Sequence, residues 1–300
     1  MLEKTDSSEQ VEINMQTLQQ LDEYLSTPFF TMELPLWGEW CLSVPASVFG
    51  SPLLMSIFSL FFAAAESSLI TALLTFELLV FVLAWIHFVP QGKIRQFFQT
   101  NATLPVFIVG NLLSIQFLSP KSFGASCFFV SGFSVVVAIV AILKRATKRL
   151  RPNFAVRARG YKSRALPIGP TAIQSTKSEK KKIADQHAAL PSGDAASCAC
   201  FVTVYLLQLN DKMASSSNSS NSSNEWNIGC AASTVVLFLC CSGRMYWRHH
   251  HFLDVCAGSL VGIFCTSLLH LFLGGFRECG WLTTLVSALI GAGLNEFTAS

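Results

Sequence analysis

The stretch Arg244-Met-Tyr-Trp-Arg-His-His-His-Phe-Leu-Asp254 lies where one apolar segment of the chain ends and the next begins. In a helix that starts near residue 248, His250 and Asp254 are four residues apart and share one face. A carboxylate in that position holds an imidazole in one tautomer and raises its basicity. Arg244 adds a permanently charged, forked donor that suits a phosphate. The spacing predicts a phosphate site beside an oriented histidine, and the alternative is a solvated cap between membrane helices.

Two other segments carry charged or small polar residues at the edge of an apolar run. Lys144-Arg-Ala-Thr-Lys-Arg-Leu-Arg151-Pro152 follows the apolar residues 123–143. Basic residues there are typical of a transmembrane helix that ends on the cytoplasmic side. Pro191-Ser-Gly-Asp194 precedes another apolar run and has the composition of an ordinary helix start. The hydroxyl of Ser192 and the free amides of such a helix start can also bind an anion.

Together the three segments resemble the type 2 phosphatidic acid phosphatase superfamily, the integral membrane lipid phosphate phosphatases related to the vanadium haloperoxidases. That family carries Lys-x6-Arg-Pro, Pro-Ser-Gly-His and Ser-Arg-x5-His-x3-Asp, in this order. The first motif is complete here, and the third has Gly243 in place of the usual serine. The second has Asp194 where the family has histidine. The resemblance covers residues 123–275.

The resemblance implies a covalent mechanism that needs no metal and no cofactor, because cationic side chains do the work of a Mg²⁺ clamp. In that mechanism His250 is the nucleophile that forms a phosphohistidine, and Asp254 orients it. The family's second-motif histidine protonates the leaving alcohol, a role that falls to Asp194 here. The phosphate oxygens would be bound by Lys144, Arg151, Ser192, the Gly193 amide and Arg244.

Asp194 is the departure with the largest chemical consequence. A free aspartic acid has a pKa of about 3.9, which burial raises and nearby cations lower. General acid help is worth roughly 100- to 10,000-fold, and a lipid alkoxide depends on it more than the phosphate leaving group of a polyprenyl diphosphate. Asp194 therefore works as a perturbed acid or marks a substrate with a good leaving group. His187 is an alternative proton donor, and a phosphate-binding protein without turnover is a third interpretation.

The composition predicts an integral, multi-pass membrane protein. The chain is 51% hydrophobic and 13% charged, has 25 phenylalanines and a mean hydropathy of +0.48. Because a span needs about 20 apolar residues, we predict an all-α, polytopic transmembrane helix bundle of about six to eight spans, with its active site at the membrane surface. Glu77 falls inside the second span, where an ionisable residue faces protein or water. The candidate spans are 44–64, 68–88, 103–119, 123–143, 195–209, 228–242, 254–273 and 281–294.

We divide the chain into five segments. They are an acidic N-terminal segment (1–43), N-terminal transmembrane helices (44–143), a basic loop (144–190), a catalytic transmembrane core (191–275) and a C-terminal apolar segment (276–300). In the first segment, apolar residues at helical spacing predict an amphipathic helix on the membrane or on the bundle, with a mobile tail as the alternative. These residues are Val11, Met15, Leu18, Leu21 and Leu25.

The basic loop predicts the orientation of the site. The positive-inside rule places residues 144–190 in the cytosol. One crossing then brings the Ser/Asn-rich residues 210–226, with glycosylation sequons at Asn218 and Asn221, to the opposite side. The next crossing returns the chain, so all three motifs meet on one face, which predicts a cytosolic active site. The sequon at Asn101 falls on the cytosolic side by the same count, so an early span is miscounted or that sequon is silent.

Cysteine and glycine spacings predict packing contacts. Most of the ten cysteines fall within apolar runs, where thiols act as small apolar side chains. Cys198-x-Cys200 and Cys240-Cys241 lack the paired spacing of a zinc site, so we predict no metal site and no disulfide framework. Gly258-x3-Gly262 follows Asp254 and predicts a close helix-helix contact.

The predicted partner is a lipid phosphate substrate reached from the membrane, and we leave open whether the chain forms a homo-oligomer. A nucleic-acid partner is excluded, because 21 basic residues stand against 18 acidic ones and the cations concentrate in one loop. A transporter is disfavoured, because the sequence shows no matching pair of broken spans. Two alternatives to a phosphatase stay open: a lipid phosphotransferase of the same superfamily, and an impaired protein that binds anionic lipids.

Overall fold

A computed structural model describes residues 5–49, 53–64, 70, 71, 73, 74, 77, 103–147, 149, 189–215, 222–276 and 278–299. Several predicted features fall outside these residues. They are Arg151 and Pro152 of the first motif, the basic loop from 150 to 188 with His187, the sequons at Asn101, Asn218 and Asn221, and most of the predicted span 68–88.

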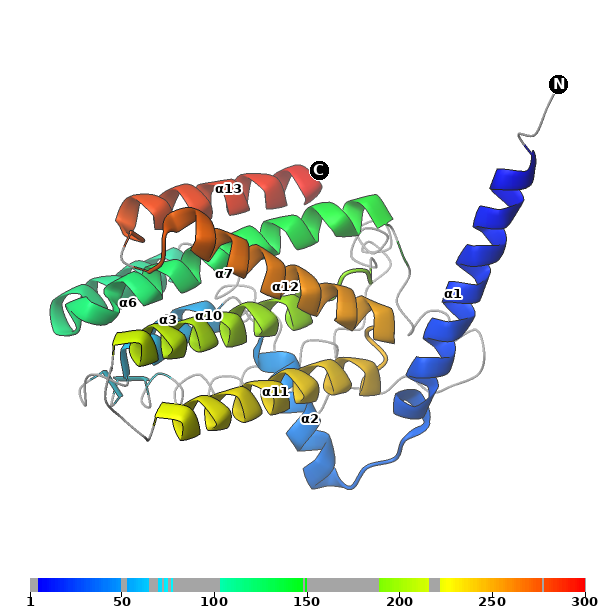
Figure 1. Ribbon diagram of the computed structural model, residues 1–300, viewed down its shortest axis with the longest axis horizontal. Coiled ribbons are helices and arrows are strands. Elements are labelled where there is room, and N and C mark those ends of the chain that lie inside the picture. The colour runs from blue at the N-terminus through cyan, green and yellow to red at the C-terminus, as the bar shows by residue number, and fades with distance from the viewer. Residues whose placement is uncertain are drawn as a thin grey trace.

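All regular structure in the described residues is helical, which confirms the all-α class. The helices are α1 (Thr5–Thr31), α2 (Leu36–Val48), α3 (Leu53–Ala64), α6 (Thr103–Leu118), α7 (Pro120–Thr147), α10 (Gly193–Ser215), α11 (Ser222–Tyr246), α12 (Phe252–Leu273) and α13 (Trp281–Ala299). Helices α7, α10, α11, α12 and α13 run side by side, and the N-terminal part of α1 extends away from one end of this bundle (Figure 1).

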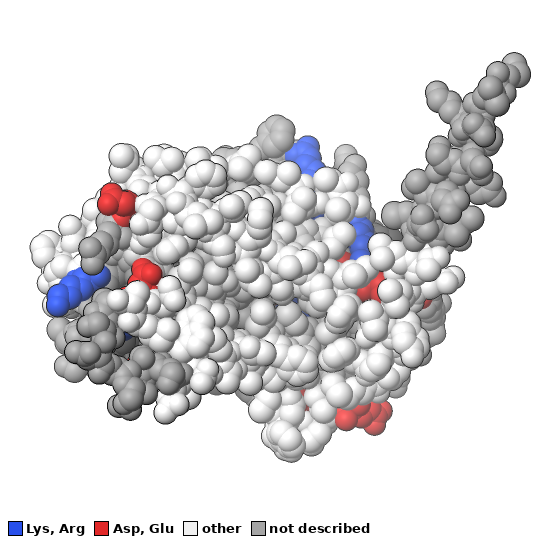
Figure 2. All heavy atoms as spheres, viewed as in Figure 1, with Lys and Arg blue, Asp and Glu red and all other residues white. Residues whose placement is uncertain are grey.

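Three segments of the described chain are long and apolar enough to cross a membrane: Pro120–Thr147, Asn224–Tyr246 and Phe252–Leu273. Shorter apolar helices run over Ile108–Leu118 and Trp281–Gly291. Large apolar side chains such as Phe264 and Phe272 are exposed, as expected of a surface that lipid covers. On the face drawn in Figure 2, charged side chains lie toward the two ends of the bundle and the surface between them is mostly uncharged.

The predicted span at 44–64 is wrong as a single helix. Helix α2 already starts at Leu36 and ends at Val48, and α3 starts at Leu53. The sequence between them is Phe49-Gly50-Ser51-Pro52. Proline lacks the backbone N–H that a continuous helix needs, and it disfavours a helical conformation of the residue before it. The mostly apolar composition of residues 44–64 therefore gave no indication that α2 ends at Val48.

Small residues bring α10 and α12 into close contact. A Cβ atom added to Gly258 would lie 2.3 Å from the carbonyl oxygen of Ser192, and one added to Gly262 would lie 2.3 Å from that of Ala196. Only glycine fits at these two positions of α12, because real Cβ atoms do not approach so closely. This is the contact that the Gly258-x3-Gly262 spacing predicts, and it fixes the start of α12 against the start of α10.

The ends of four helices meet at the same end of the bundle. These are the last turns of α7 and α11 and the first turns of α10 and α12 (Figure 1). Although about forty residues separate α7 from α10, the chain returns to nearly the same place: the Ala189 N–H donates to the Arg149 carbonyl at 2.7 Å, and the Thr147 hydroxyl donates to the Leu190 carbonyl at 2.7 Å. The described residues of the three sequence motifs are thereby brought to one end.

Candidate active site

Asp254 lies in the first turn of α12 and caps it. The His251 N–H donates to Asp254 Oδ2 at 2.8 Å, and the Asp254 backbone N–H faces the His251 side chain, which is the arrangement of a capping box. The Asp254 side chain is fully buried. A carboxylate is favoured here because the first amides of a helix have no acceptor within the helix and carry partial positive charge. The helix start therefore fixes the position of a buried negative charge.

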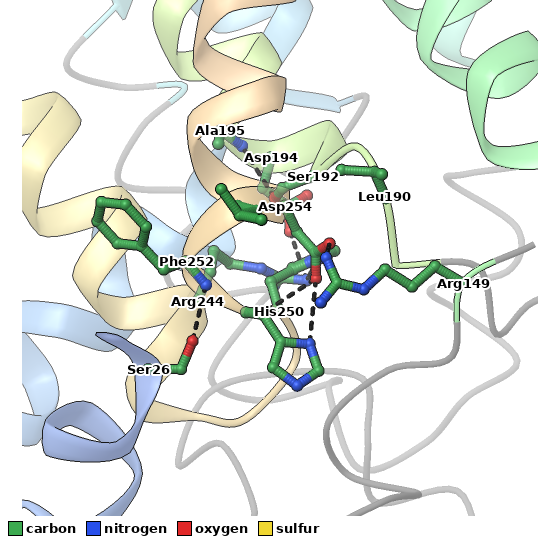
Figure 3. Close-up of polar contacts among 12 residues, drawn as sticks. Ser26, Arg149, Leu190, Ser192, Asp194, Ala195, Arg244, His250, Phe252 and Asp254 are labelled. Carbon is green, nitrogen blue, oxygen red and sulfur yellow. Dashed lines mark hydrogen bonds and ion pairs between the residues drawn. The ribbon is translucent and has the colours of Figure 1, made fainter. Parts of the chain in front are cut away.

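His250 lies between groups of opposite charge (Figure 3). Its Nδ1 atom is 3.9 Å from Asp254 Oδ2, and its Nε2 atom is 3.4 Å from Arg244 Nη2. The side chain is almost completely buried. In the tautomer that carries its proton on Nδ1, this proton faces the carboxylate and the Nε2 lone pair lies on the side of the guanidinium. Catalytic hydrogen bonds are often longer before the substrate binds, so the 3.9 Å separation fits an orienting carboxylate.

Arg244 links the third motif to the second. Its Nη2 atom forms an ion pair with Asp194 Oδ2 at 2.6 Å, and its Nη1 atom donates to the Ala46 carbonyl at 3.4 Å. Asp194 is in the first turn of α10, and Arg244 is in the last turn of α11. The same guanidinium nitrogen therefore contacts both the Asp194 carboxylate and the nucleophile candidate His250.

The turn after α11 is held in an unusual conformation. Arg248 has φ 57°, in the left-handed region that usually costs a non-glycine residue about 1 kcal/mol or more. Two backbone hydrogen bonds close this turn, from Arg248 N to Met245 O at 2.7 Å and from His249 N to Arg244 O at 3.0 Å. The Arg248 guanidinium donates to the Phe30 carbonyl at 2.6 Å, which stabilises the turn that leads into His250.

Ser192 and Gly193 form the start of α10 and contact both other motifs. The Ser192 N–H donates to the Asp254 carbonyl at 2.8 Å, and its buried hydroxyl accepts from the Ala195 N–H at 3.4 Å. The Lys144 ammonium lies 3.7 Å from the point where a Cβ on residue 193 would be. The cation of the first motif thus lies at the helix start that the second motif supplies, a combination that suits an anion.

The structure brings together every predicted site residue that it describes. His250, Asp254, Arg244 and Asp194 are joined by contacts of 2.6 to 3.9 Å. Lys144, Ser192 and Gly193 adjoin them through the start of α10. Arg151 lies outside the described residues, so its predicted contact with phosphate stays a prediction.

Three residues that the sequence motifs did not identify take part in this site. Arg149 Nη1 donates to Asp254 Oδ1 at 3.0 Å, and its Nη2 pairs with the buried Asp22 carboxylate of α1. Asp22 Oδ1 accepts from the Leu253 N–H at 2.8 Å, and the Ser26 hydroxyl accepts from the Phe252 N–H at 2.9 Å. The i, i+4 spacing of Asp22 and Ser26 is the one sequence feature that could have pointed to them.

The structure also explains why glycine replaces serine in the third motif. A Cβ atom on Gly243 would lie 2.3 Å from the Leu42 carbonyl oxygen and 2.7 Å from the Ala46 Cβ. Helix α2 crosses α11 at this point, so a serine would need α2 to move. The Tyr246 hydroxyl also donates to Glu39 of α2 at 2.7 Å. The departure at Gly243 therefore reflects packing against α2.

The site combines cations, carboxylates and an oriented imidazole at one end of the bundle. The family model described as the PAP2 superfamily matches residues 125–278, from the second turn of α7 to the segment after α12. No match to a curated protein was found, and no solved structure matches the chain.

Proposed function

The chain belongs to the PAP2 superfamily, whose members are phosphatases, and on this premise we propose that it removes a phosphate from a membrane lipid through a phosphohistidine on His250. The chain is a membrane protein with apolar helices long enough to span a bilayer. The observation that carries the proposal is the placement of His250, with Nδ1 toward Asp254 and Nε2 toward Arg244.

In the first step, His250 Nε2 attacks the terminal phosphorus, the N–P bond forms and the bond from phosphorus to the leaving oxygen breaks. From a lipid diphosphate the lipid monophosphate leaves as an anion, whereas a monoester releases an alkoxide that must gain a proton to become the alcohol. Asp254 stabilises the positive charge that develops on the ring. Arg244, Lys144, the Ser192 hydroxyl and the Gly193 amide supply donors for the phosphate oxygens. In the second step, water attacks phosphorus and passes a proton to the Asp194 carboxylate, the P–N bond breaks, inorganic phosphate leaves and His250 returns to its neutral form.

The contacts of Asp194 favour one class of substrate. Its ion pair with Arg244 at 2.6 Å stabilises the carboxylate, the form that accepts a proton and cannot donate one. A carboxylate suits the second step, in which the attacking water loses a proton. It does not help an alkoxide to leave, whereas a lipid diphosphate releases a phosphate anion that needs no proton at that moment. We therefore place lipid diphosphates ahead of phosphatidate as substrates.

Phosphate release by the purified, detergent-solubilised protein tests this function. The substrates are phosphatidate, lysophosphatidate, sphingosine phosphate and isoprenoid diphosphates, with EDTA present and with His250→Ala as the control. We expect release that EDTA does not reduce, that is fastest with a diphosphate and that disappears in His250→Ala. Release that requires a divalent metal, or that survives in His250→Ala, would contradict the mechanism. Transfer of phosphate to an added lipid alcohol without release would identify a phosphotransferase.

The basic composition of residues 144–190 supports a cytosolic site, with the Ser/Asn-rich segment on the opposite side. Expression in glycosylating cells tests this orientation. We expect the mass that glycosidase removes from the wild-type chain to be absent from Asn218→Gln/Asn221→Gln and unchanged in Asn101→Gln. The reverse pattern would place the site in the lumen or outside the cell.

A further inference from the structure

One face of α1 lies against the start of α12, although α1 precedes the family-matched residues 125–278. Asp22, Ser26 and Phe30 are four residues apart along the helix and all three are buried. By contrast, Leu18 and Leu21, part of the apolar repeat that predicted an amphipathic helix, are about half exposed, at 48% and 50%. The docked face of α1 therefore carries a carboxylate and a hydroxyl, which points to a role beyond apolar packing.

Asp22 and Ser26 satisfy the first amides of α12. The Phe252 N–H donates to the Ser26 hydroxyl at 2.9 Å, and the Leu253 N–H donates to Asp22 Oδ1 at 2.8 Å. These amides belong to the first turn of α12 and have no acceptor within their own helix. Phe30 adds an edge-on contact with the His251 ring, at 5.9 Å between ring centres. Helix α1 thus contacts all three residues that lie between His250 and Asp254 in the chain.

The second oxygen of Asp22 acts at longer range, through Arg149. The Arg149 guanidinium pairs with Asp22 Oδ2 through one nitrogen and donates to Asp254 Oδ1 at 3.0 Å through another. The remaining oxygen of Asp254, Oδ2, faces the His251 N–H and His250 Nδ1. Asp22, Arg149, Asp254 and His250 therefore form a continuous series of polar contacts, and the orientation of the Asp254 carboxylate depends on where Asp22 holds Arg149.

The negative charge of Asp22 has a second effect on the His250–Asp254 pair. A guanidinium shared by Asp22 and Asp254 leaves one net negative charge on the three groups. Without the Asp22 carboxylate, Arg149 would neutralise Asp254, and the imidazolium that develops on His250 would lose its counter-charge. Because the Asp22 and Asp254 side chains are fully buried, little solvent is available to replace that charge.

We infer that Asp22 is a positioning residue for the His250–Asp254 pair, and that it acts through Arg149 and the Leu253 amide. The inference rests on the proposed function, and it makes α1 a part of the active site that residues 125–278 alone lack. Asp22 does not touch the reacting atoms, so its removal should slow the phosphoryl transfer step and leave substrate binding nearly unchanged.

Asp22→Asn tests the inference, because asparagine keeps an acceptor for the Leu253 N–H and removes the charge that holds Arg149. We expect kcat to fall about 10- to 100-fold, as for a small displacement of a catalytic group, with KM changed by less than about threefold. Glu33→Gln is the matched control, since Glu33 is exposed and the change removes the same charge. It should keep the wild-type kcat.

Two further variants separate positioning from mere stabilisation of the helix start. Ser26→Ala removes a capping acceptor of α12 without touching Arg149, so it should lower the melting temperature at least as much as Asp22→Asn while kcat falls far less. In an Arg149→Gln background, Asp22→Asn should have little further effect on kcat, because the two residues act in series. Equal kcat losses in Ser26→Ala and Asp22→Asn, or additive losses with Arg149→Gln, would overturn the inference.

The two proposals fail in different experiments. If the wild-type protein and its His250→Ala variant release phosphate equally, the proposed function fails, and the catalytic role of Asp22 fails with it. If the wild type is active and Asp22→Asn matches Glu33→Gln in kcat, only the inference fails. Hydrogen exchange at the Phe252 and Leu253 amides gives a check that needs no activity: both should be protected in the wild type and exchange faster in Asp22→Ala/Ser26→Ala. Unprotected amides in the wild type would overturn the inference.

Discussion

The two ends of α12 are stabilised by different kinds of contact. At its C-terminal end, Gly274 in the left-handed conformation (φ 67°) closes the helix, and its N–H donates to the Leu271 carbonyl at 3.3 Å. At its N-terminal end, α1 accepts hydrogen bonds from the first amides, Arg149 donates to the Asp254 carboxylate, and the Ser192 N–H at the start of α10 donates to the Asp254 carbonyl. The first end needs only residues next to it in sequence, whereas the second gathers polar groups from across the chain.

This difference separates contacts that only stabilise the helix from contacts that position the candidate catalytic groups. A glycine cap is the most common way to end a helix, and it brings no charge and no distant partner. The N-terminal end contains a buried ion pair and a second one that contacts the nucleophile candidate. Burying such charges is costly and rarely improves stability by itself. We therefore expect changes at the N-terminal end of α12 to lower activity more than stability. Changes at the C-terminal end should lower stability more than activity.

Among changes near the N-terminal end of α12, loss of Arg244 should lower activity the most. Arg244→Gln removes the charge beside His250 Nε2 and leaves Asp194 without its ion-pair partner. By analogy with the loss of a charge-stabilising donor, we expect kcat/KM to fall about 100- to 1000-fold. Lys121→Gln, which removes an exposed cation at the other end of α7, is the control and should be near wild type. A loss below tenfold in Arg244→Gln would argue against a phosphate at this position.

Asp194→His should change substrate preference. A histidine restores the family's proton donor, so kcat/KM for phosphatidate should rise about tenfold or more relative to that for an isoprenoid diphosphate. The companion variant Asp194→Ala removes the proton acceptor of the second step, so a phosphorylated enzyme should accumulate. Initial rates on both substrates measure the first effect. An identical change on the two substrates would contradict the leaving-group interpretation.

Gly258→Ala should weaken the contact that seats α12 on α10. The added Cβ would meet the Ser192 carbonyl at 2.3 Å, and overpacking of this kind costs about 1–3 kcal/mol. We expect both a lower melting temperature in detergent and reduced activity, because Ser192 also contacts Asp254. Gly110→Ala in α6, where an added Cβ meets nothing within 4 Å, provides the comparison and should not lower stability. Equal melting temperatures for the two variants would show that the contact can relax.

At the C-terminal end, Gly274→Ala should lower stability with little effect on activity. An alanine at φ 67° costs about 1 kcal/mol, and asparagine tolerates this conformation better, so Gly274→Asn should recover part of the loss. Thermal unfolding and phosphate release measured on the same samples check this prediction. A kcat that falls as far as in Gly258→Ala would remove the distinction between the two ends.

The sequence predicted the helices and the site residues close to their ends, and it missed contacts between residues that are far apart in the chain. Apolar runs located most of the helices, because burial in lipid demands long apolar segments. The motif spacings identified Lys144, Asp194, Arg244, His250 and Asp254, because each motif lies within a few residues of a helix end. The spacing of Gly258 and Gly262 predicted the close approach of α12 to another helix, since only small residues permit two helices to come so near.

Arg149, Asp22 and Ser26 could not be identified in that way. Arg149 stands among many basic residues of one segment, and nothing in the sequence distinguishes it from Arg145 or Lys148. Asp22 pairs with a residue 127 positions away, a contact that only the packed chain defines. The predicted span at 44–64 failed for a related reason: mean hydropathy does not register where one helix ends and the next begins.

Trapping the phosphorylated enzyme tests the central claim most directly. The wild-type protein is mixed with an isoprenoid diphosphate labelled at its terminal phosphate, quenched in alkali after one turnover and digested for mass spectrometry. The account predicts a base-stable, acid-labile phosphate on His250 of the wild type, more of it in Asp194→Ala and none in His250→Ala. A phosphate on another residue, or phosphate release by wild type at full rate without a labelled His250, would contradict it.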